Sequence, residues 1–210
     1  MTVFNPNDAA SENSGVFGLP FSEKEAKLIL IPIPWEATTS YGGGTSRGPA
    51  AILNASRQVD LFDLELGNFY EAGINMIEES RAVHDWNKKA KNAAQTVIKG
   101  GCEGKNLAQH LRAVNDLSER INQFVYEETK KYLDMGKIVG LIGGDHSSPF
   151  GGIRALLEKF PRLGILHFDA HADLRNAYEG FTDSHASIMY NVITKTKIEK
   201  LVQVGIRDFS

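Results

Sequence analysis

Cysteine, excess charge of one sign and long apolar runs are all scarce in this 210-residue sequence. Its single cysteine, Cys102, excludes an intramolecular disulfide and is typical of a reducing compartment. The 23 Lys and Arg residues against 26 Asp and Glu give a net charge of −3, without the basic excess of a nucleic-acid-binding surface. No run approaches the roughly 18 apolar residues of a membrane span, and residues 1–20 do not form a basic and then apolar leader. These absences predict a cytoplasmic protein that binds neither nucleic acid nor membrane.

The length, together with the lack of internal repeats and low-complexity tracts, predicts a single domain over residues 1–210. Residues 1–19 are polar and rich in turn-forming residues, which indicates an arm rather than a packed element. The least readable part, about residues 65–115, is interpreted as a helical insertion in that domain. Residues 80–99 have a helical composition, and residues 59–64 could form a strand.

Apolar runs alternate with helical patterns in the rest of the chain. We expect strands at 26–33, 137–142, 163–168 and 201–206, and helices at 49–56, 116–135, 151–160 and 187–194. Strands and helices that alternate at this spacing predict βαβ units, a mainly parallel sheet and an α/β fold.

Polar clusters follow two of these strands, at the edge where ligands bind in open α/β sheets. Asp169, His171 and Asp173 alternate with alanines, so an extended chain would point all three side chains to one side. Fully extended, Asp169 and Asp173 would lie about 13 Å apart, so either the segment curls or the residues bind two adjacent ions. His146, on the loop after the neighbouring strand, supplies a second direction of approach. Carboxylates and imidazoles without a thiolate suit Mn²⁺, Ni²⁺ or Zn²⁺.

Four segments together resemble the ureohydrolases, the family of arginase, agmatinase and formimidoylglutamase. These segments are GGDHS (143–147), DAHAD (169–173), the glycine-rich YGGGTSRGPAAI (41–52) and FTDSHAS (181–187). The resemblance implies the three-layer α/β arginase fold. It also implies a homo-oligomer, either a trimer or a hexamer. The family's later Ser-x-Asp-x-Asp ligand segment has no match here, so we expect a fold that is incomplete at the C-terminus, as in the N-terminal part of a longer protein.

The resemblance also implies a role for each motif residue. His146, Asp169, His171 and Asp173 would be ligands of a binuclear centre, usually two Mn²⁺ ions, with Ni²⁺ as the alternative. His185 would sit beside the substrate and carry protons, since a histidine pKa near 6.5 suits that task. Activity is expected of the full-length protein, whereas the 210-residue chain alone is expected to be inactive.

The implied reaction is hydrolysis of a small guanidino compound to urea and an amine. Glu179 and Asp183 lie near His185 in the sequence, and acids there would repel a substrate carboxylate. This favours agmatine, which would give putrescine and urea, over arginine or formiminoglutamate, although both acids could equally be solvated loop charges. Asp145 either orients a metal ligand or caps its loop.

Other readings of the sequence stay open. Guanidine is the alternative substrate, because the arm and the insertion are similar to segments of guanidine hydrolases in this family; a formimidoylglutamase is a further alternative. A deacetylase of the same fold would bind one catalytic ion, whereas His146 and Asp173 together argue for two. A non-catalytic member of the family would fit the missing third motif.

Overall fold

The computed structural model describes residues 4–6, 8–11, 13–100 and 103–208, so Cys102 lies outside the described residues. The helices are α1 (Gly48–Ser56), α2 (Arg81–Ile98), α3 (Gly104–Asp134), α4 (Phe150–Lys159) and α5 (Ile188–Lys195). The strands are β1 (Leu28–Ile33), β2 (Ile74–Met76), β3 (Ile138–Gly143), β4 (Gly164–Phe168) and β5 (Lys200–Val204). No helix in the described part of the chain combines the length and apolar content needed to cross a membrane.

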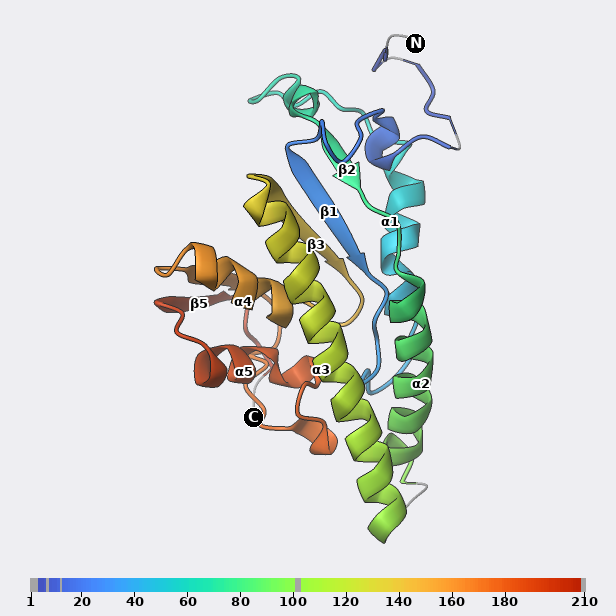
Figure 1. Ribbon diagram of the computed structural model, residues 1–210, viewed down its shortest axis with the longest axis vertical. Helices are drawn as coiled ribbons and strands as arrows, with labels where there is room; N and C mark the ends of the chain where they lie inside the picture. Colours follow the sequence, from blue (N-terminus) through green and yellow to red (C-terminus); the bar gives the residue numbers. More distant parts are fainter. Residues whose placement is uncertain (1–3, 7, 12, 101–102, 209–210) are drawn as a thin grey trace.

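All strand pairs in the described residues are parallel, as the alternation of strands and helices predicts. One sheet has the order β2-β1-β3 (Figure 1), and a second sheet pairs β4 with β5. In the first sheet Leu28 lies opposite Ile74 on one side and Ile138 on the other. Strands β3 and β4 share no ladder among the described residues, so the parallel strands are divided between two sheets.

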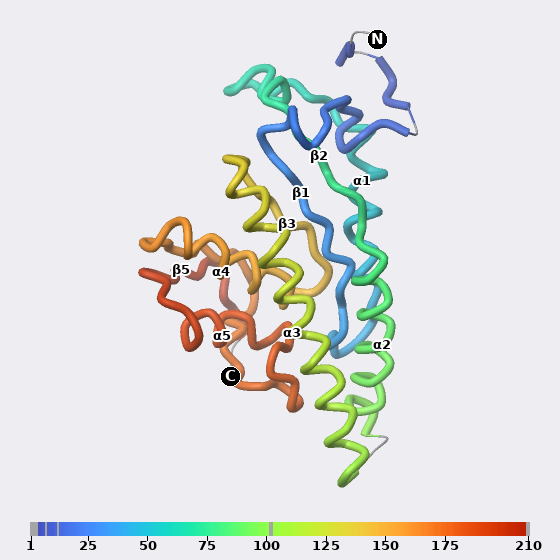
Figure 2. Tube along the Cα trace, viewed as in Figure 1, coloured from blue at the N-terminus to red at the C-terminus, as the bar shows by residue number. Residues whose placement is uncertain are grey.

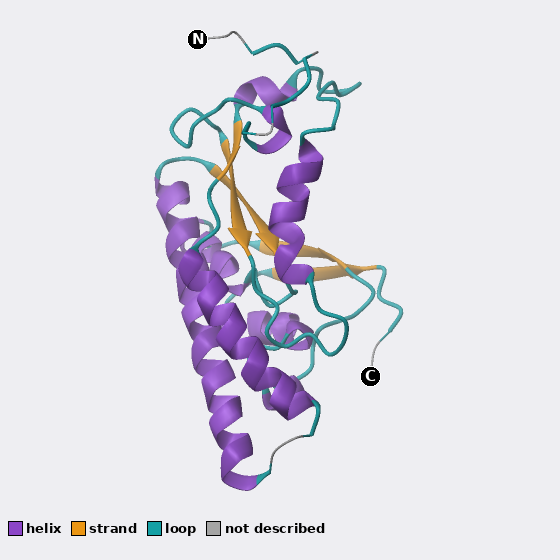
Figure 3. Ribbon diagram, turned by 90° about the vertical axis from the view of Figure 1, so that its right-hand side faces the viewer, coloured by secondary structure: helices purple, strands orange, loops and turns teal. Residues whose placement is uncertain are grey.

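The first sheet lies between two helical layers because β1 alternates its apolar side chains. Ile29, Ile31 and Ile33 are fully buried in the cluster that includes residues of α2 and α3. Leu28 and Leu30 belong to the cluster on the opposite face, which α1 joins through a side chain of its own. Figure 3 shows the strands between α1 and the α2–α3 pair. This helix–sheet–helix arrangement confirms the predicted three-layer α/β class.

Helices α2 and α3 form a long antiparallel hairpin that extends past the end of the first sheet (Figure 2). The helix predicted at 80–99 is confirmed as α2. The helix predicted to start at Asp116 begins earlier, at Gly104. The prediction missed these first turns although Leu107, Leu111 and Val114 follow the helical spacing of i, i+4 and i+7. Val114 stabilises this part of α3 by packing against Phe181 in a satellite apolar cluster.

Three expectations for local structure need correction. Residues 59–64 form no strand, because the Asp63 carboxylate accepts hydrogen bonds from the amides of Glu65 and Leu66 and closes a turn there. The short strand β2 was not predicted. The predicted arm is packed at its end, since Val16 and Leu19 are each 1% exposed.

The second sheet is covered on one face only. Ile165 and Leu201 pack against a cluster that contains Ile188 and Val192 of α5. The alternate side chains Leu166 and Phe168 are 60% and 70% exposed. An apolar face without a cover in the described part of the chain agrees with the expectation of an incomplete fold.

Candidate metal centre and adjacent cavity

The loop after β3 is pressed against the end of β1. Gly144 has a φ of +64°, and a Cβ at this position would lie 2.2 Å from the carbonyl oxygen of Trp35. Only glycine fits so close an approach. The next amide, that of Asp145, donates to the same Trp35 oxygen at 2.7 Å. These contacts fix the backbone that carries His146.

His146 meets the carboxylates of the loop after β4. Its Nδ1 atom lies 3.0 Å from Oδ2 of Asp169 and 2.7 Å from Oδ2 of Asp173. The segment 169–173 therefore curls, with Asp173 at a φ of +52°, and does not remain extended. Three of the four predicted ligands converge within direct contact distance.

The electrostatics of this cluster favour a cation. Burial opposes the charged form of His146, but the carboxylates of Asp173 and Asp169 outweigh it and raise the His146 pKa. Burial also acts against ionised Asp169, yet the backbone amide of His171 and the charge of His146 lower the pKa of that carboxyl. Nitrogen and carboxylate oxygen donors in a site that stabilises positive charge fit a divalent ion such as Mn²⁺.

His171, the fourth predicted ligand, is only partly gathered in. Its Nδ1 atom lies 3.4 Å from Oδ1 of Asp169, but 60% of its side chain is exposed. Its Nε2 atom lies 3.5 Å from the carboxylate of Asp208. The ring therefore borders the cluster from the solvent side, next to the cavity described below.

His167 belongs to the cluster and was missed by the sequence analysis. One ligand atom each from His146, His167, Asp169 and Asp173 lie within 4.8 Å of one another. His167 precedes Asp169 by two residues on β4, so the period-two rule that grouped Asp169 with His171 also indicated it.

Gln203 of β5 determines what His167 can do. The amide nitrogen of Gln203 donates to the carbonyl of Ala172 at 2.8 Å and lies 2.9 Å from Nδ1 of His167. Because that nitrogen is only a donor, Nδ1 accepts, and the ring proton sits on Nε2. Nε2 lies 3.4 Å from Oδ2 of Asp169. His167 thus turns its N–H side toward the Asp169 carboxylate without an aligned hydrogen bond, at a distance from which a small movement would let it donate.

Asp145 sits behind the cluster rather than in it. One carboxylate oxygen accepts from the amide of Ser147 at 2.9 Å and from its hydroxyl at 2.5 Å. Complete burial raises the pKa of Asp145, against the lowering effect of these hydrogen bonds. The Ser147 contacts close the turn that carries His146, which agrees with the predicted loop-capping alternative.

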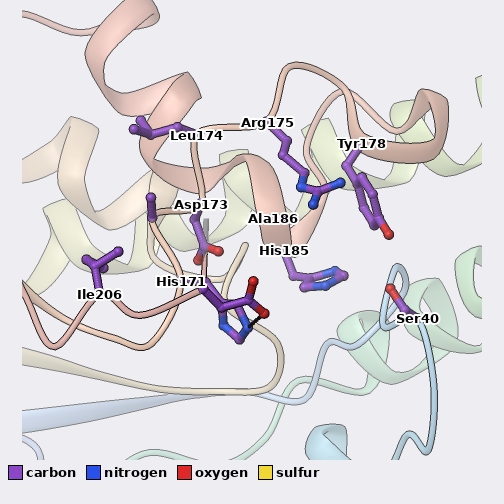
Figure 4. A pocket seen from close by; sticks show the side chains of 11 residues that line it. Ser40, His171, Asp173, Leu174, Arg175, Tyr178, His185, Ala186 and Ile206 are labelled. Atoms are coloured by element: carbon purple, nitrogen blue, oxygen red, sulfur yellow. Dashed lines mark ion pairs between the residues drawn. The ribbon is translucent and has the colours of Figure 1, made fainter. Parts of the chain in front are cut away.

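A cavity of about 540 Å³ opens beside the cluster. Its walls include Asp173 and His171 on one side and His185, Tyr178 and Ser40 on the other (Figure 4). The predicted proton carrier and two predicted ligands therefore share one cavity.

His185 is held from behind by the segment after β1. Its backbone amide donates to Oγ1 of Thr38 at 3.1 Å, and the same oxygen lies 3.3 Å from its Nδ1 atom. Because the Thr38 oxygen accepts from the amide, its own proton is available for Nδ1. The ring also meets Tyr178 edge-on, with centroids 6.2 Å apart. These contacts fix the imidazole at the cavity wall.

Arg175 is a cavity residue that the sequence analysis did not single out. Its guanidinium lies over the Tyr178 ring, 4.7 Å from the centroid, and both side chains face the cavity (Figure 4). Arg175 follows Asp173 by only two residues, so its place in the sequence beside a predicted ligand could have indicated that it lies near the site.

The comparison with known families decides the classification. The model of the Arginase family matches residues 26–210. The chain belongs to the Arginase family.

Individual relatives agree with this assignment. The chain is 34% identical over 194 residues to the N(1)-aminopropylagmatine ureohydrolase of Thermus thermophilus, covering 90% of this chain and 55% of the relative. It is 26% identical over 192 residues to the agmatinase of Bacillus anthracis, covering 89% and 54%. The solved proclavaminate amidino hydrolase of Streptomyces clavuligerus has a similar fold, with a TM-score of 0.66 at 19% identity over 97% of this chain and 60% of that one. The chain spans about half the length of the curated relatives that it matches.

In this Arginase-family chain, Asp183 and Glu179 do not lie in the cavity, where they would have to be in order to repel a substrate carboxylate. The Asp183 carboxylate is buried and accepts from the side-chain amides of Asn122 and Asn191, at 3.2 and 3.4 Å. Glu179 is exposed, and neither acid belongs to the cavity wall. The hydrogen bonds of Asp183 direct its carboxylate toward α3 and α5, so the structure lends no support to the prediction that these two acids line the cavity.

Proposed function

We propose that the intact protein hydrolyses a guanidino compound to urea and an amine. The observation that carries the proposal is the convergence of His146, Asp169 and Asp173, because Asp173 of this cluster also lines the cavity that His185 lines. Membership of the Arginase family supports the reaction class. The cavity is large enough for a small aliphatic guanidino compound.

His146, Asp169, His171 and Asp173 are the residues that would hold two divalent ions, with Mn²⁺ proposed and Ni²⁺ as the alternative. When bound, the ions supply the positive charge that lowers the pKa of water and provides hydroxide for attack on the guanidinium carbon. His167 and Asp145 would keep the ligands in position, the first through Asp169 and the second through the loop of His146.

His185 is proposed to move the proton that the departing amine needs. Thr38 holds the Nδ1 side of the ring, so the opposite side of the imidazole is left to serve the cavity. An imidazole can both accept and donate a proton, so one fixed next to the reacting centre is suited to general acid catalysis.

The substrate that we propose is a guanidino amine, either agmatine, which would yield putrescine, or its aminopropyl derivative. The names of the similar proteins support this choice, since both act on decarboxylated guanidino compounds. The support comes from these relatives and no longer from Glu179 and Asp183. We also propose that the intact protein is a cytoplasmic homo-oligomer, as in the family that it resembles.

Urea release by the purified intact protein tests the proposal. The protein is stripped of metal, reloaded with Mn²⁺ or Ni²⁺, and supplied with agmatine, aminopropylagmatine, guanidine or arginine. We expect about two bound ions per chain by elemental analysis, and urea from the first two compounds at a higher kcat/KM than from the others. His146→Ala should abolish urea release, whereas His84→Ala, a half-exposed histidine on α2, should not. Urea from none of the four compounds would overturn the proposal.

A further inference from the structure

The glycine-rich loop near the cavity has a backbone whose own residues do not determine its conformation. Gly42, Gly43 and Gly44 have consecutive φ values of +77°, +74° and +108°. Three glycines in this region confer no preferred conformation, and fixing them costs conformational entropy. The loop must therefore be held by contacts from outside it.

One buried carboxylate, that of Glu36, supplies these contacts. Its Oε2 atom accepts from the amides of Gly44 and Ser46, at 2.5 and 3.0 Å, and from the hydroxyl of Thr45, at 3.1 Å. Glu36 is 3% exposed. Three donors from consecutive residues close the loop around this single oxygen.

Helix α2 contacts Glu36 from the other side. Lys91 forms an ion pair with the second carboxylate oxygen of Glu36. One turn earlier, the side-chain oxygen of Asn87 accepts from the backbone amide of Glu36 at 2.8 Å. Residues four apart share a helix face, so Asn87 and Lys91 act on the same segment. Gly43 leaves the room that this needs, since a Cβ there would lie 2.6 Å from Nζ of Lys91.

Ser40, two residues before the first of the three glycines, is the residue of this segment that lines the cavity. It lies on the same side of the cavity as Tyr178 and His185 (Figure 4), and in the chain it lies between Glu36 and the residues that Glu36 holds. Tyr41, the next residue, is 93% exposed at the loop tip and is not anchored by burial. The position of this wall therefore depends on Glu36 and, through it, on α2.

We propose that the Glu36–Lys91 pair is a positioning device through which α2 holds the glycine-rich loop and thereby fixes Ser40 at the wall of the cavity. The proposal rests on the proposed function and assigns a role to part of the 65–115 segment. Glu36 and Lys91 take no part in the ion pairs of His146, Asp169 and Asp173, so we expect the pair to act mainly on substrate binding.

Lys91→Met in the intact, metal-loaded protein tests the proposal. We expect the KM for agmatine to rise about fivefold or more while kcat stays within about twofold, and amide hydrogen exchange in residues 38–46 to accelerate. Lys88→Met, an exposed lysine on the same helix, is the matched control and should change neither quantity. Lys91→Arg keeps the positive charge, so its KM for agmatine should stay close to that of the wild type.

The double variant Glu36→Gln/Lys91→Met guards against misfolding, because it leaves no unpaired charge in the interior. It should show the same rise in KM. If amide hydrogen exchange in residues 38–46 is unchanged in Lys91→Met, the Glu36–Lys91 pair does not hold the loop, and the proposal is overturned whatever the activity. Faster exchange with an unchanged KM would overturn its role as a substrate wall. Failure of the proposed function would look different, since the wild-type protein itself would then release no urea.

Discussion

His167 shows how one hydrogen bond can determine the role of a residue. With Gln203 donating to Nδ1, the His167 ring presents an N–H toward Asp169. We expect His167→Phe to weaken Mn²⁺ binding about 10- to 100-fold, as the loss of such supporting donors typically does. His167→Gln places an amide N–H near the position of Nε2 and should retain most of the affinity. Titration of the metal-free intact protein with Mn²⁺ measures both. If His167→Gln binds as weakly as His167→Phe, the residue is a direct ligand instead.

Asp183 has a structural role that predicts a stability effect without a change in specificity. Asp183→Ala leaves the buried amides of Asn122 and Asn191 without their shared acceptor. An unsatisfied buried donor costs about 1 to 3 kcal/mol, so the free energy of unfolding should fall by that amount in urea denaturation. The ratio of kcat/KM for agmatine and arginine should stay unchanged. Glu179→Ala, at an exposed position, should alter neither quantity, and a changed ratio in Asp183→Ala would restore the original substrate argument.

Glu36 should make the stability of the fold depend on pH in the acid range. Burial opposes its ionisation, but Lys91 and the amides of Ser46 and Gly44 lower its pKa from 4.5 to about 2. A lowered pKa gives stability that is present above pH 4.5 and is lost as the pH falls toward 2. Over that range the wild type should lose about 1 to 2 kcal/mol more than Glu36→Gln, after allowance for solvent screening. Chemical denaturation at pH 6 and pH 3 measures the difference, with the exposed Glu65→Gln as control. Equal losses in wild type and Glu36→Gln would contradict this account.

At the scale of elements, the end of α3 offers a test of backbone strain alone. Gly136 has a φ of +74°, and its amide donates to the carbonyl of Leu133 at 3.0 Å. A Cβ at this position would meet nothing within 4 Å, so a substitution adds strain and no clash. We expect Gly136→Ala to destabilise the protein by about 1 kcal/mol in thermal or urea unfolding, and Gly136→Asn by less. A loss in Gly136→Asn equal to that in Gly136→Ala would argue against a left-handed cap.

The elements that were predicted are those whose own residues determine them. Strands β1, β3, β4 and β5 carry apolar runs, and α1 and α2 are marked by Pro49 and Gly100 at their ends. Strand β2 has three residues, too few for a pattern. Residues 59–64 were mistaken for a strand because they are rich in apolar side chains, whereas the Asp63 carboxylate closes a turn over residues 63–67. The first turns of α3 depend on packing with distant residues.

At the scale of the whole molecule, the sequence indicated the His146–Asp169–Asp173 cluster better than the rest of the cavity wall. His146, Asp169 and Asp173 were predicted because strand ends bring their loops to a common place. The cavity wall depends on where each side chain points after a chain curls. Spacing does not determine that direction, so Arg175 and Ser40 were missed and Asp183 was misplaced.

The register of the first sheet has a consequence for synthesis on the ribosome. Leu28 of β1 pairs with Ile138 of β3, which is translated 110 residues later. At about 5 to 20 residues per second, β1 waits roughly 6 to 20 seconds for that neighbour. Helix α2 is made within this interval and can cover Ile29 and Ile31 before the ladder closes. In addition to holding the glycine-rich loop, α2 is therefore placed to shield a nascent apolar strand from premature association.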